Sequence, residues 1–382
     1  MSQSIPARTS NSPVPWPLLA GAAAISSIVF GLYWDISWHM TIGRDSFWTP
    51  AHLAIQFGAM LAALSCGYLV LHTTFGADAA ARESSVSVWG VRGPFGAFLA
   101  AWGGATMMIS APFDNWWHDS FGLDVQIVSP PHMVLATGIF FVGIGTLVLM
   151  AGPKNRAEGA VKVKLERLFL YIGAVLLTLY LVLSIEYTDF GGMHRGEFYR
   201  VVSYGTPLML ATLARGSGLR WAATKAAIFY FVFCAVAVWV FPLFPAQAKL
   251  GPVYTNVTHM VPLQFPLLMF VPALAVDWLV QRMKDRNKLL LALAVGSAFL
   301  AATVAVHWPF AQFMISPWAR NWVFGMTYFP YMQAPSTYHF NYEFWPEQPG
   351  FFWKNMGIAW LAACISALVG LQFGDWLRKL KR

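Results

Sequence analysis

The sequence predicts an all-α, polytopic integral membrane protein of about ten transmembrane helices with an internal two-helix repeat. Hydrophobic residues make up 57% of the 382 positions and charged residues only 11%, whereas an average soluble domain carries about 25% charged residues. Ten apolar segments approach the roughly 20 residues that a helix needs to cross a bilayer. A motif of aspartate and histidine occurs twice near the N-terminus, once in each of two successive hairpins. The composition also excludes a disordered chain, because disordered segments are polar and poor in aromatic residues.

The predicted spans follow one another along the whole chain. The sixth is the least apolar, because it contains Arg200 and Pro207. We interpret the first as an uncleaved anchor rather than a signal peptide, because its outer end runs directly into the first copy of the motif. Residues 1–150 hold the two hairpins, and residues 151–382 hold further helices and a long outer loop, 311–354. The ten spans are residues 16–34, 50–72, 94–112, 131–151, 167–185, 198–214, 222–243, 261–280, 289–310 and 355–374.

Positive charges orient these spans. With the N-terminus inside, the inner segments carry 19 of the 25 Lys and Arg residues, and positive residues concentrate on the cytoplasmic side of membrane proteins. We therefore expect a multi-pass protein of a bacterial inner (cytoplasmic) membrane, in contact with membrane lipid, with both termini cytoplasmic. The net charge of +8 reflects a shortage of acids, only 17, rather than an excess of bases, which argues against a nucleic-acid partner.

The repeated motif joins an Asp-x3-His pair at the end of one span to a [Ser/Thr]-Pro-x-His sequence at the start of the next. The first copy reads WDISWHMTIGRDSFWTPAH and the second DNWWHDSFGLDVQIVSPPH. Residues four apart lie on one face of a helix, and proline favours the first turn of a helix. Each proline therefore places a histidine at the start of a returning helix, where it can face the Asp–His pair. The two sets are Asp35, His39 and His52, and Asp114, His118 and His132.

Two imidazoles and one carboxylate are a metal-ligand set. They suit Cu(II), Zn(II) or non-haem Fe(II), and three protein ligands leave a position open for water, oxygen or substrate. The alternative is architectural: the Asp and His side chains would only hydrogen-bond across the hairpin caps, and the neighbouring tryptophans would anchor the membrane interface. Repetition of the same three residue types favours the metal interpretation.

The segment GRDSFWTPAHL, from Gly43 to Leu53, resembles the RDTDFTPSH signature in one membrane subunit of the copper membrane monooxygenases, the particulate methane and ammonia monooxygenase family. In the family an Asp-x3-His-x12-His set of this subunit binds one copper ion, and the first set here has the same residues and gaps. A second family set, Asn-x3-His-x13-His, can bind another copper, and the second set here matches its spacing with Asp114 in place of Asn. The resemblance covers about residues 30–140.

The resemblance implies copper as the cofactor, with zinc or iron as the other metals that suit the ligands. It implies a role in O2-dependent oxidation of a small apolar substrate, together with partner subunits or a copper-donor protein at the outer face. It assigns no catalytic residue here. Family members are shorter, residues 150–382 have no recognised counterpart, and no segment reads as a cupredoxin-like domain. A non-catalytic copper-handling or assembly factor and a transporter stay open, although a transporter usually has ionisable groups at the membrane midplane.

Three further features lie on the predicted outer face. The third outer loop carries Asp189, His194, Glu197 and Glu186, and lacks the [Ser/Thr]-Pro-x-His ending. We expect a polar cap there, with a degenerate ligand set as the alternative. The lone histidines His259 and His307 are expected to be structural. The loop 311–354 is rich in aromatic residues and too apolar to be simply solvated, so we expect it either to cover the outer sites as a lid or to dock a partner.

Overall fold

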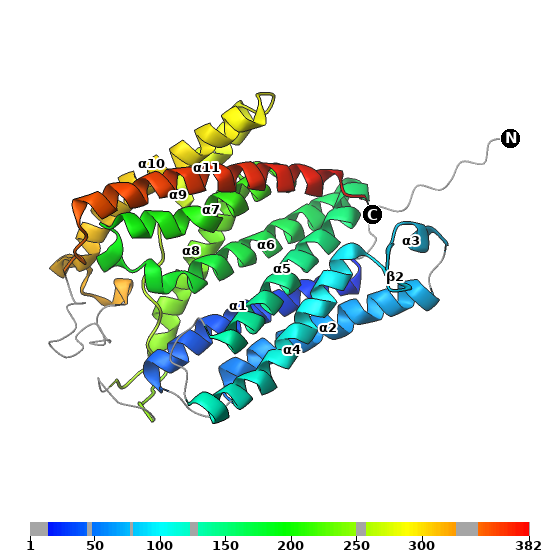
Figure 1. Ribbon diagram of the computed structural model, residues 1–382, viewed down its shortest axis with the longest axis horizontal. Helices are drawn as coiled ribbons and strands as arrows, with labels where there is room; N and C mark the ends of the chain where they lie inside the picture. The colour runs from blue at the N-terminus through cyan, green and yellow to red at the C-terminus, as the bar shows by residue number, and fades with distance from the viewer. Residues whose placement is uncertain are drawn as a thin grey trace. The chain divides into compact units, whose positions relative to one another are not determined.

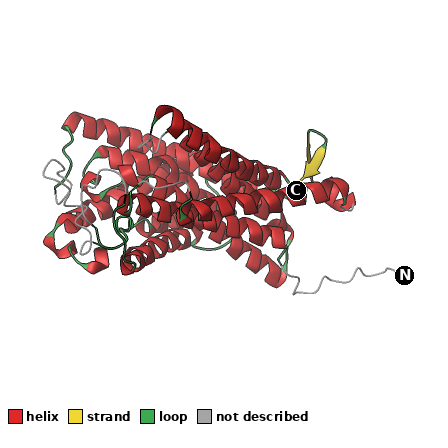
Figure 2. Cartoon of the chain, turned by 90° about the horizontal axis from the view of Figure 1, so that it is seen from below, coloured by secondary structure: helices red, strands yellow, loops and turns green. Residues whose placement is uncertain are grey.

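The computed structural model describes residues 14–43, 48–76, 79–122, 129–249, 257–325 and 343–381. Almost all of its regular structure is helical (Figure 2). The exception among these residues is an antiparallel hairpin of β1 (Val86–Val88) and β2 (Val91–Gly93), whose turn residues Trp89 and Gly90 both have positive φ. Such two-residue turns match the twist of paired strands. The all-α class is therefore confirmed, with one small hairpin that the sequence did not predict.

Four long helices form the two predicted helical hairpins. The first consists of α1 (Trp16–Thr41) and α2 (Pro50–Phe75), the second of α4 (Phe95–Phe121) and α5 (Pro130–Arg156) (Figure 1). The short helix α3 (Ala79–Glu83) lies between the two hairpins in the chain. Both α1 and α4 continue past their predicted ends at 34 and 112, so each Asp–His pair lies within a helix. The run of apolar residues ends at Asp35 in α1 and at Asp114 in α4, but each helix continues beyond its aspartate.

Five further predicted spans are also helices. The predicted loop 311–354 is shorter than expected at both ends, because the helices on either side extend into it; residues 326–342 lie outside the described part of the chain. The five are α6 (Gly159–Leu183), α7 (Gly196–Gly216), α8 (Ala222–Val240) with the 3-10 turn Phe241–Leu243, α10 (Lys288–Ile315) and α11 (Pro349–Lys379).

The eighth predicted span, 261–280, is helical only in its second half. Residues 261–268 have no regular secondary structure, and α9 (Phe270–Arg282) has 13 residues, fewer than a bilayer-spanning helix requires. Pro262 and Pro266 explain the difference, because proline lacks the N–H that a helix needs and disfavours a helical residue before it. The prediction of a full-length helix here is wrong. Most of residues 261–268 are nevertheless buried.

Seven of the described helices are long and apolar enough to cross a membrane. They also expose large apolar side chains: on α2 such residues recur every three or four positions, and Leu64 is 66% exposed. A continuous stripe of this kind is unfavourable in water, whereas lipid tails are as apolar as the side chains themselves. The helix lengths and surfaces are therefore those of a multi-pass membrane protein. The stripe on α2 comprises Leu53, Phe57, Met60, Leu64, Tyr68, Leu71 and Phe75.

The chain divides into two compact units, and this division differs from the predicted regions 1–150 and 151–382. Unit 1 comprises residues 1–28, 56–172 and 377–382, and unit 2 comprises residues 29–55 and 173–376. The first Asp/His/His set therefore belongs to unit 2 and the second to unit 1.

Each unit has its own packing. In unit 1, α4 lies along α5 (Figure 1), and the two helices approach closely because glycines lie at the contact. A Cβ atom on Gly103 would lie 2.6 Å from the backbone N of Val142, and one on Gly138 would lie 2.6 Å from Cγ of Met107. In unit 2, α9 packs against α7, α8 and α10. The core of each unit is thus built from neighbouring helices.

Candidate metal centre

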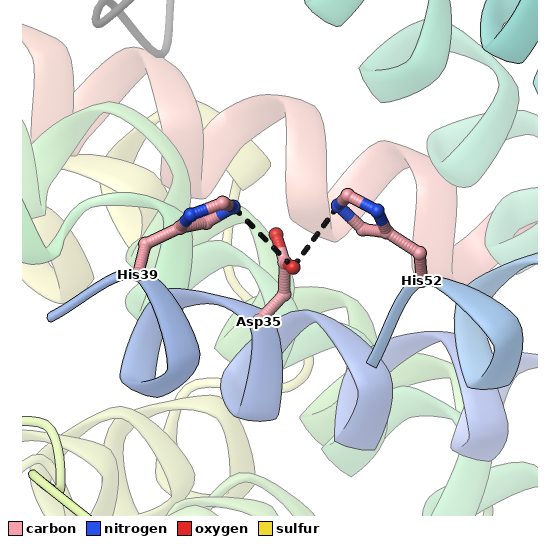
Figure 3. A group of neighbouring side chains, drawn as sticks. All are labelled: Asp35, His39 and His52. Carbon is pink, nitrogen blue, oxygen red and sulfur yellow. Dashed lines mark ion pairs between the residues drawn. The ribbon is translucent and has the colours of Figure 1, made fainter. Parts of the chain in front are cut away.

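The first Asp/His/His set brings three side chains to one point near the end of α1 (Figure 3). The Nε2 atoms of His39 and His52 lie 3.6 Å and 3.1 Å from the same atom, Oδ1 of Asp35. One ligand atom from each residue lies within 4.8 Å of the other two. Oδ1 of Asp35 is buried and has no hydrogen-bond partner among the described residues. Two nitrogens and a carboxylate oxygen converge here as ion pairs, an arrangement that a bound cation would also satisfy.

The helix ends place these side chains. Helix α1 stops just before Gly43, whose φ of 84° is in the left-handed region that glycine adopts readily. After the loop, Oγ1 of Thr49 accepts the backbone N–H of His52 at 3.1 Å. Thr49 is therefore the N-cap, Pro50 starts α2, and His52 lies in the first turn. The [Ser/Thr]-Pro-x-His sequence is thus a helix start that holds its histidine at a defined position.

A glycine on α1 allows the two helices of the first hairpin to approach. A Cβ atom on Gly31 would lie 2.8 Å from Cγ1 and 2.9 Å from the backbone N of Ile55, in the second turn of α2. Side-chain atoms do not tolerate such distances, so any larger residue at position 31 would push α2 outward. Gly31 was not predicted from the sequence, because small residues are common in membrane helices and carry no signal of this contact.

The second set has the same arrangement in a looser form. Nε2 of His118 lies 3.4 Å from Oδ2 of Asp114, and Nε2 of His132 lies 3.6 Å from Oδ1. Among the described residues, only the first set has all three ligand atoms within 4.8 Å of one another. Oδ1 of Asp114 is also buried and without a hydrogen-bond partner in the described part of the chain.

The two hairpins correspond in their backbone as well. Helix α4 ends at Gly122 with a φ of 85°, as α1 ends at Gly43. Oγ of Ser129 accepts the backbone N–H of His132 at 3.4 Å, as Thr49 does for its histidine. Sequence repetition thus corresponds to repetition of a helix end and a capped helix start.

The second set also indicates the proton arrangement of one imidazole. Nδ1 of His118 lies 3.3 Å from the carbonyl oxygen of Gly122. Because a carbonyl can only accept, Nδ1 carries the proton in the neutral ring and Nε2 keeps its lone pair. That lone pair faces the Asp114 carboxylate, and two acceptors facing each other are favourable only with a proton or a cation between them. An outer hydrogen bond that fixes the ring in this way is usual for metal-binding histidines.

The donor types fit a divalent transition metal. Each set offers two imidazole nitrogens and one carboxylate, a combination that suits copper, zinc and non-haem iron. In the first set the His39 side chain is 41% exposed, so an ion or a small molecule can approach from that side. The structure brings the three side chains of each predicted set close to one another.

Among the described residues, Asp189, His194 and Glu197 of the third outer loop do not form a possible metal-ligand group. Asp189 accepts the N–H of Gly191 at 2.8 Å, and Glu197 pairs with Arg195 at 2.8 Å. His194 donates to the carbonyl of Trp308 at 3.0 Å and stacks on its ring. Burial raises the pKa of Asp189 to about 6. Each group has its own partner, which favours the predicted polar cap; the Glu186 side chain lies outside the described residues.

The two lone histidines have local partners. His307 is buried on α10, where its Nε2 accepts the N–H of Leu268 at 3.0 Å and its Nδ1 donates to the carbonyl of Thr303 at 3.0 Å. Nδ1 of His259 lies 2.9 Å from Oγ1 of Thr258. Both arrangements are those of structural histidines.

A scan of protein-family models, and comparisons with curated proteins and with solved structures, find no match to this chain.

Proposed function

We propose that this chain is a copper-binding integral membrane protein that contributes to O2-dependent oxidation of a small apolar substrate. The observation that supports it most is the convergence of His39, His52 and a buried, unbonded oxygen of Asp35. Imidazole is a suitable ligand for copper, and the affinity of divalent ions rises to a maximum at copper. The motif's resemblance to a membrane subunit of the copper membrane monooxygenases favours the same metal and the oxidation chemistry.

The residues of the chain would hold and orient the reactants. Bound copper would supply the oxygen chemistry. Asp35 would offset part of the ion's charge, and His39 and His52 would bind through Nε2, leaving a position for an exogenous ligand. Exposed apolar faces such as the stripe on α2 would admit a hydrophobic substrate from the lipid.

Metal analysis of purified variants tests the site. We expect wild type to hold copper after loading, and His39→Ala to lose about one ion or to bind it at least about tenfold more weakly. His118→Ala should remove a separate, weaker ion. His72→Ala is the matched control, since His72 lies on α2 outside both sets and should leave copper unchanged. Equal copper in all four proteins, or none in wild type, would mean that the repeat is architectural.

A copper-handling role is the second candidate. The 41% exposure of the His39 side chain leaves the first set open to ligand exchange with a donor or acceptor protein. Transfer of copper from the loaded protein to an acceptor, with no substrate oxidation, would favour this role over the enzyme. Oxidation that is lost in His39→Ala would favour the enzyme.

The proposal includes ten membrane crossings, with both termini on the cytoplasmic side of a bacterial inner membrane. The eighth crossing would combine the non-helical residues 261–268 with α9. At about 1.5 Å per residue α9 covers about 20 Å, and the residues before it would supply the rest of the roughly 30 Å. Cysteine labelling tests the orientation: Ser120→Cys should react from outside intact cells and Glu158→Cys should not. The reverse result would place the Asp/His/His sets on the inner face.

A further inference from the structure

The face of α1 opposite the first Asp/His/His set is hydrogen-bonded to Val261, the first residue of the non-helical segment 261–268. A helix advances about 100° per residue, so Ser37 and Thr41 lie on the side of α1 away from Asp35 and His39. Both hydroxyl side chains are buried. Polar groups buried in a helix interface indicate specific partners, because unpaired ones are costly.

The partner of both hydroxyls is the backbone of Val261. The N–H of Val261 donates to Oγ1 of Thr41 at 2.8 Å, and Oγ of Ser37 donates to the carbonyl of Val261. Oγ1 of Thr41 in turn donates to the carbonyl of Ser37 at 2.6 Å. A non-helical backbone in an apolar interior cannot use water, so it needs such partners. We call these three hydrogen bonds the Val261 clamp.

Val261 is itself held on both sides. The N–H of Met260 donates to the carbonyl of Phe244 at 2.9 Å. Further along, the N–H of Leu267 donates to the Tyr230 hydroxyl at 3.1 Å, and Leu268 is bonded to His307 as described above. The clamp therefore attaches α1 to a segment that is anchored in unit 2 before and after the point of attachment.

Contacts on either side of the clamp hold the same part of α1. Tyr33, one turn before Ser37, packs edge-on against Phe233 and Phe241. After the helix, the N–H of Lys249 donates to the carbonyl of Ile42 at 2.9 Å. These contacts limit translation of α1, and the clamp supplies the directional bonds that resist rotation about its axis.

We infer that Ser37 and Thr41 are positioning residues, which fix the rotation of the last two turns of α1 and so the direction in which Asp35 and His39 face His52. The inference rests on the proposed copper site for its main readout. It assigns a role to the proline-interrupted segment: because Pro262 disfavours a helical conformation at Val261, the peptide of Val261 is available to the side chains of another helix.

The test removes the two hydroxyls and compares the result with an equal deletion elsewhere. The clamp variant is Ser37→Ala with Thr41→Val. The control is Thr178→Val with Ser184→Ala in unit 2, where both buried hydroxyls bond to a carbonyl four residues earlier. Three quantities are measured: Cu(II) affinity by chelator competition, the hyperfine splitting of bound Cu(II) by electron paramagnetic resonance, and the rate at which diethyl pyrocarbonate modifies His52 in metal-free protein.

We expect the clamp variant to bind Cu(II) about tenfold more weakly, with altered hyperfine splitting and faster His52 modification, while the control matches wild type. Thr41→Ser, made alone, should match wild type in all three measurements, because it keeps the hydroxyl. A clamp variant that matches wild type in all three measurements would overturn the inference and leave the copper site intact. Absence of copper in wild type would refute the proposed function instead, and the His52 modification rate alone would then decide on the clamp. If the double variant fails to fold, Thr41→Val alone is assessed by the same measurements.

Discussion

The two outer hairpins share one motif but differ in what supports it. The last turns of α1 are held within unit 2 by Tyr33, Ser37 and Thr41. The corresponding residues on α4, 79 positions later, are Pro112, Trp116 and Ser120. Pro112 interrupts the helix hydrogen bonds, and Trp116 is 54% exposed. In the first hairpin two imidazoles approach one carboxylate oxygen, and in the second they approach different oxygens. The motif supplies the ligand types. The contacts on the side of the helix away from the ligands decide how closely the ligand atoms converge.

The largest expected effect comes from removing the carboxylate charge of each set. Asp35→Asn should weaken Cu(II) binding at the first site by at least about tenfold, because an amide oxygen is a neutral and poorer ligand. Asp114→Asn should cost less, since the second set converges less closely. Chelator competition on the two variants measures both losses. Equal losses would show that the supporting contacts do not distinguish the hairpins.

The close approach of α1 and α2 is tested at Gly31. Gly31→Ala should lower the free energy of unfolding by about 1–3 kcal/mol, because the added Cβ meets the backbone of Ile55, and it should also reduce copper at the first site. Gly67→Ala on α2 is the matched control, because a Cβ there has no atom within 4 Å. It should be neutral or slightly stabilising, since alanine favours helix. Thermal unfolding in detergent and metal analysis give the result; identical behaviour of the two variants would argue against the predicted clash.

The helix caps offer a smaller effect on both hairpins. Thr49→Ala and Ser129→Ala should each cost about 1 kcal/mol of stability, because each leaves a helix N–H without its side-chain partner. The cost should be greater at Thr49, whose bond to the His52 N–H is shorter than that of Ser129 to His132, 3.1 Å against 3.4 Å. Thermal unfolding of both variants, with Thr49→Ser as the control that keeps the hydroxyl, measures the difference. A larger loss at Ser129 would contradict it.

The third outer loop provides a reference in which the carboxyl group is structural. Burial raises the pKa of Asp189 to about 6 from 3.8, so the folded state binds more protons than the unfolded state between these values. Stability should therefore fall as pH rises from about 4 to about 6, by at most about 3 kcal/mol for a shift of this size. Asp189→Asn should remove this slope and leave copper content unchanged. Unfolding at several pH values tests the slope, and loss of copper in Asp189→Asn would make the loop part of a metal site.

The helices and the ligand residues could be predicted from the sequence because their causes are local. Apolar composition over about 20 residues indicates a span, and four-residue spacing places Asp35 and His39 on one face whatever surrounds them. The start of α2 is similarly local, since the Thr49-Pro50 pair caps a helix through its own neighbours. The non-helical start of the eighth span also has a local cause, because Pro262 disfavours helix at its own position and at the residue before it. Apolar composition alone does not reveal this break.

Only the tertiary structure decided how those ligands meet. The clamp joins Ser37 to Val261, which lies 224 residues away in the chain, and no local pattern marks such a pair. The same holds for Gly31, whose importance depends on where Ile55 lies, and for the placement of the two similar sets in different units. The residue types of a site follow from short-range sequence, whereas the spacing of its atoms depends on contacts between distant segments that only folding brings together.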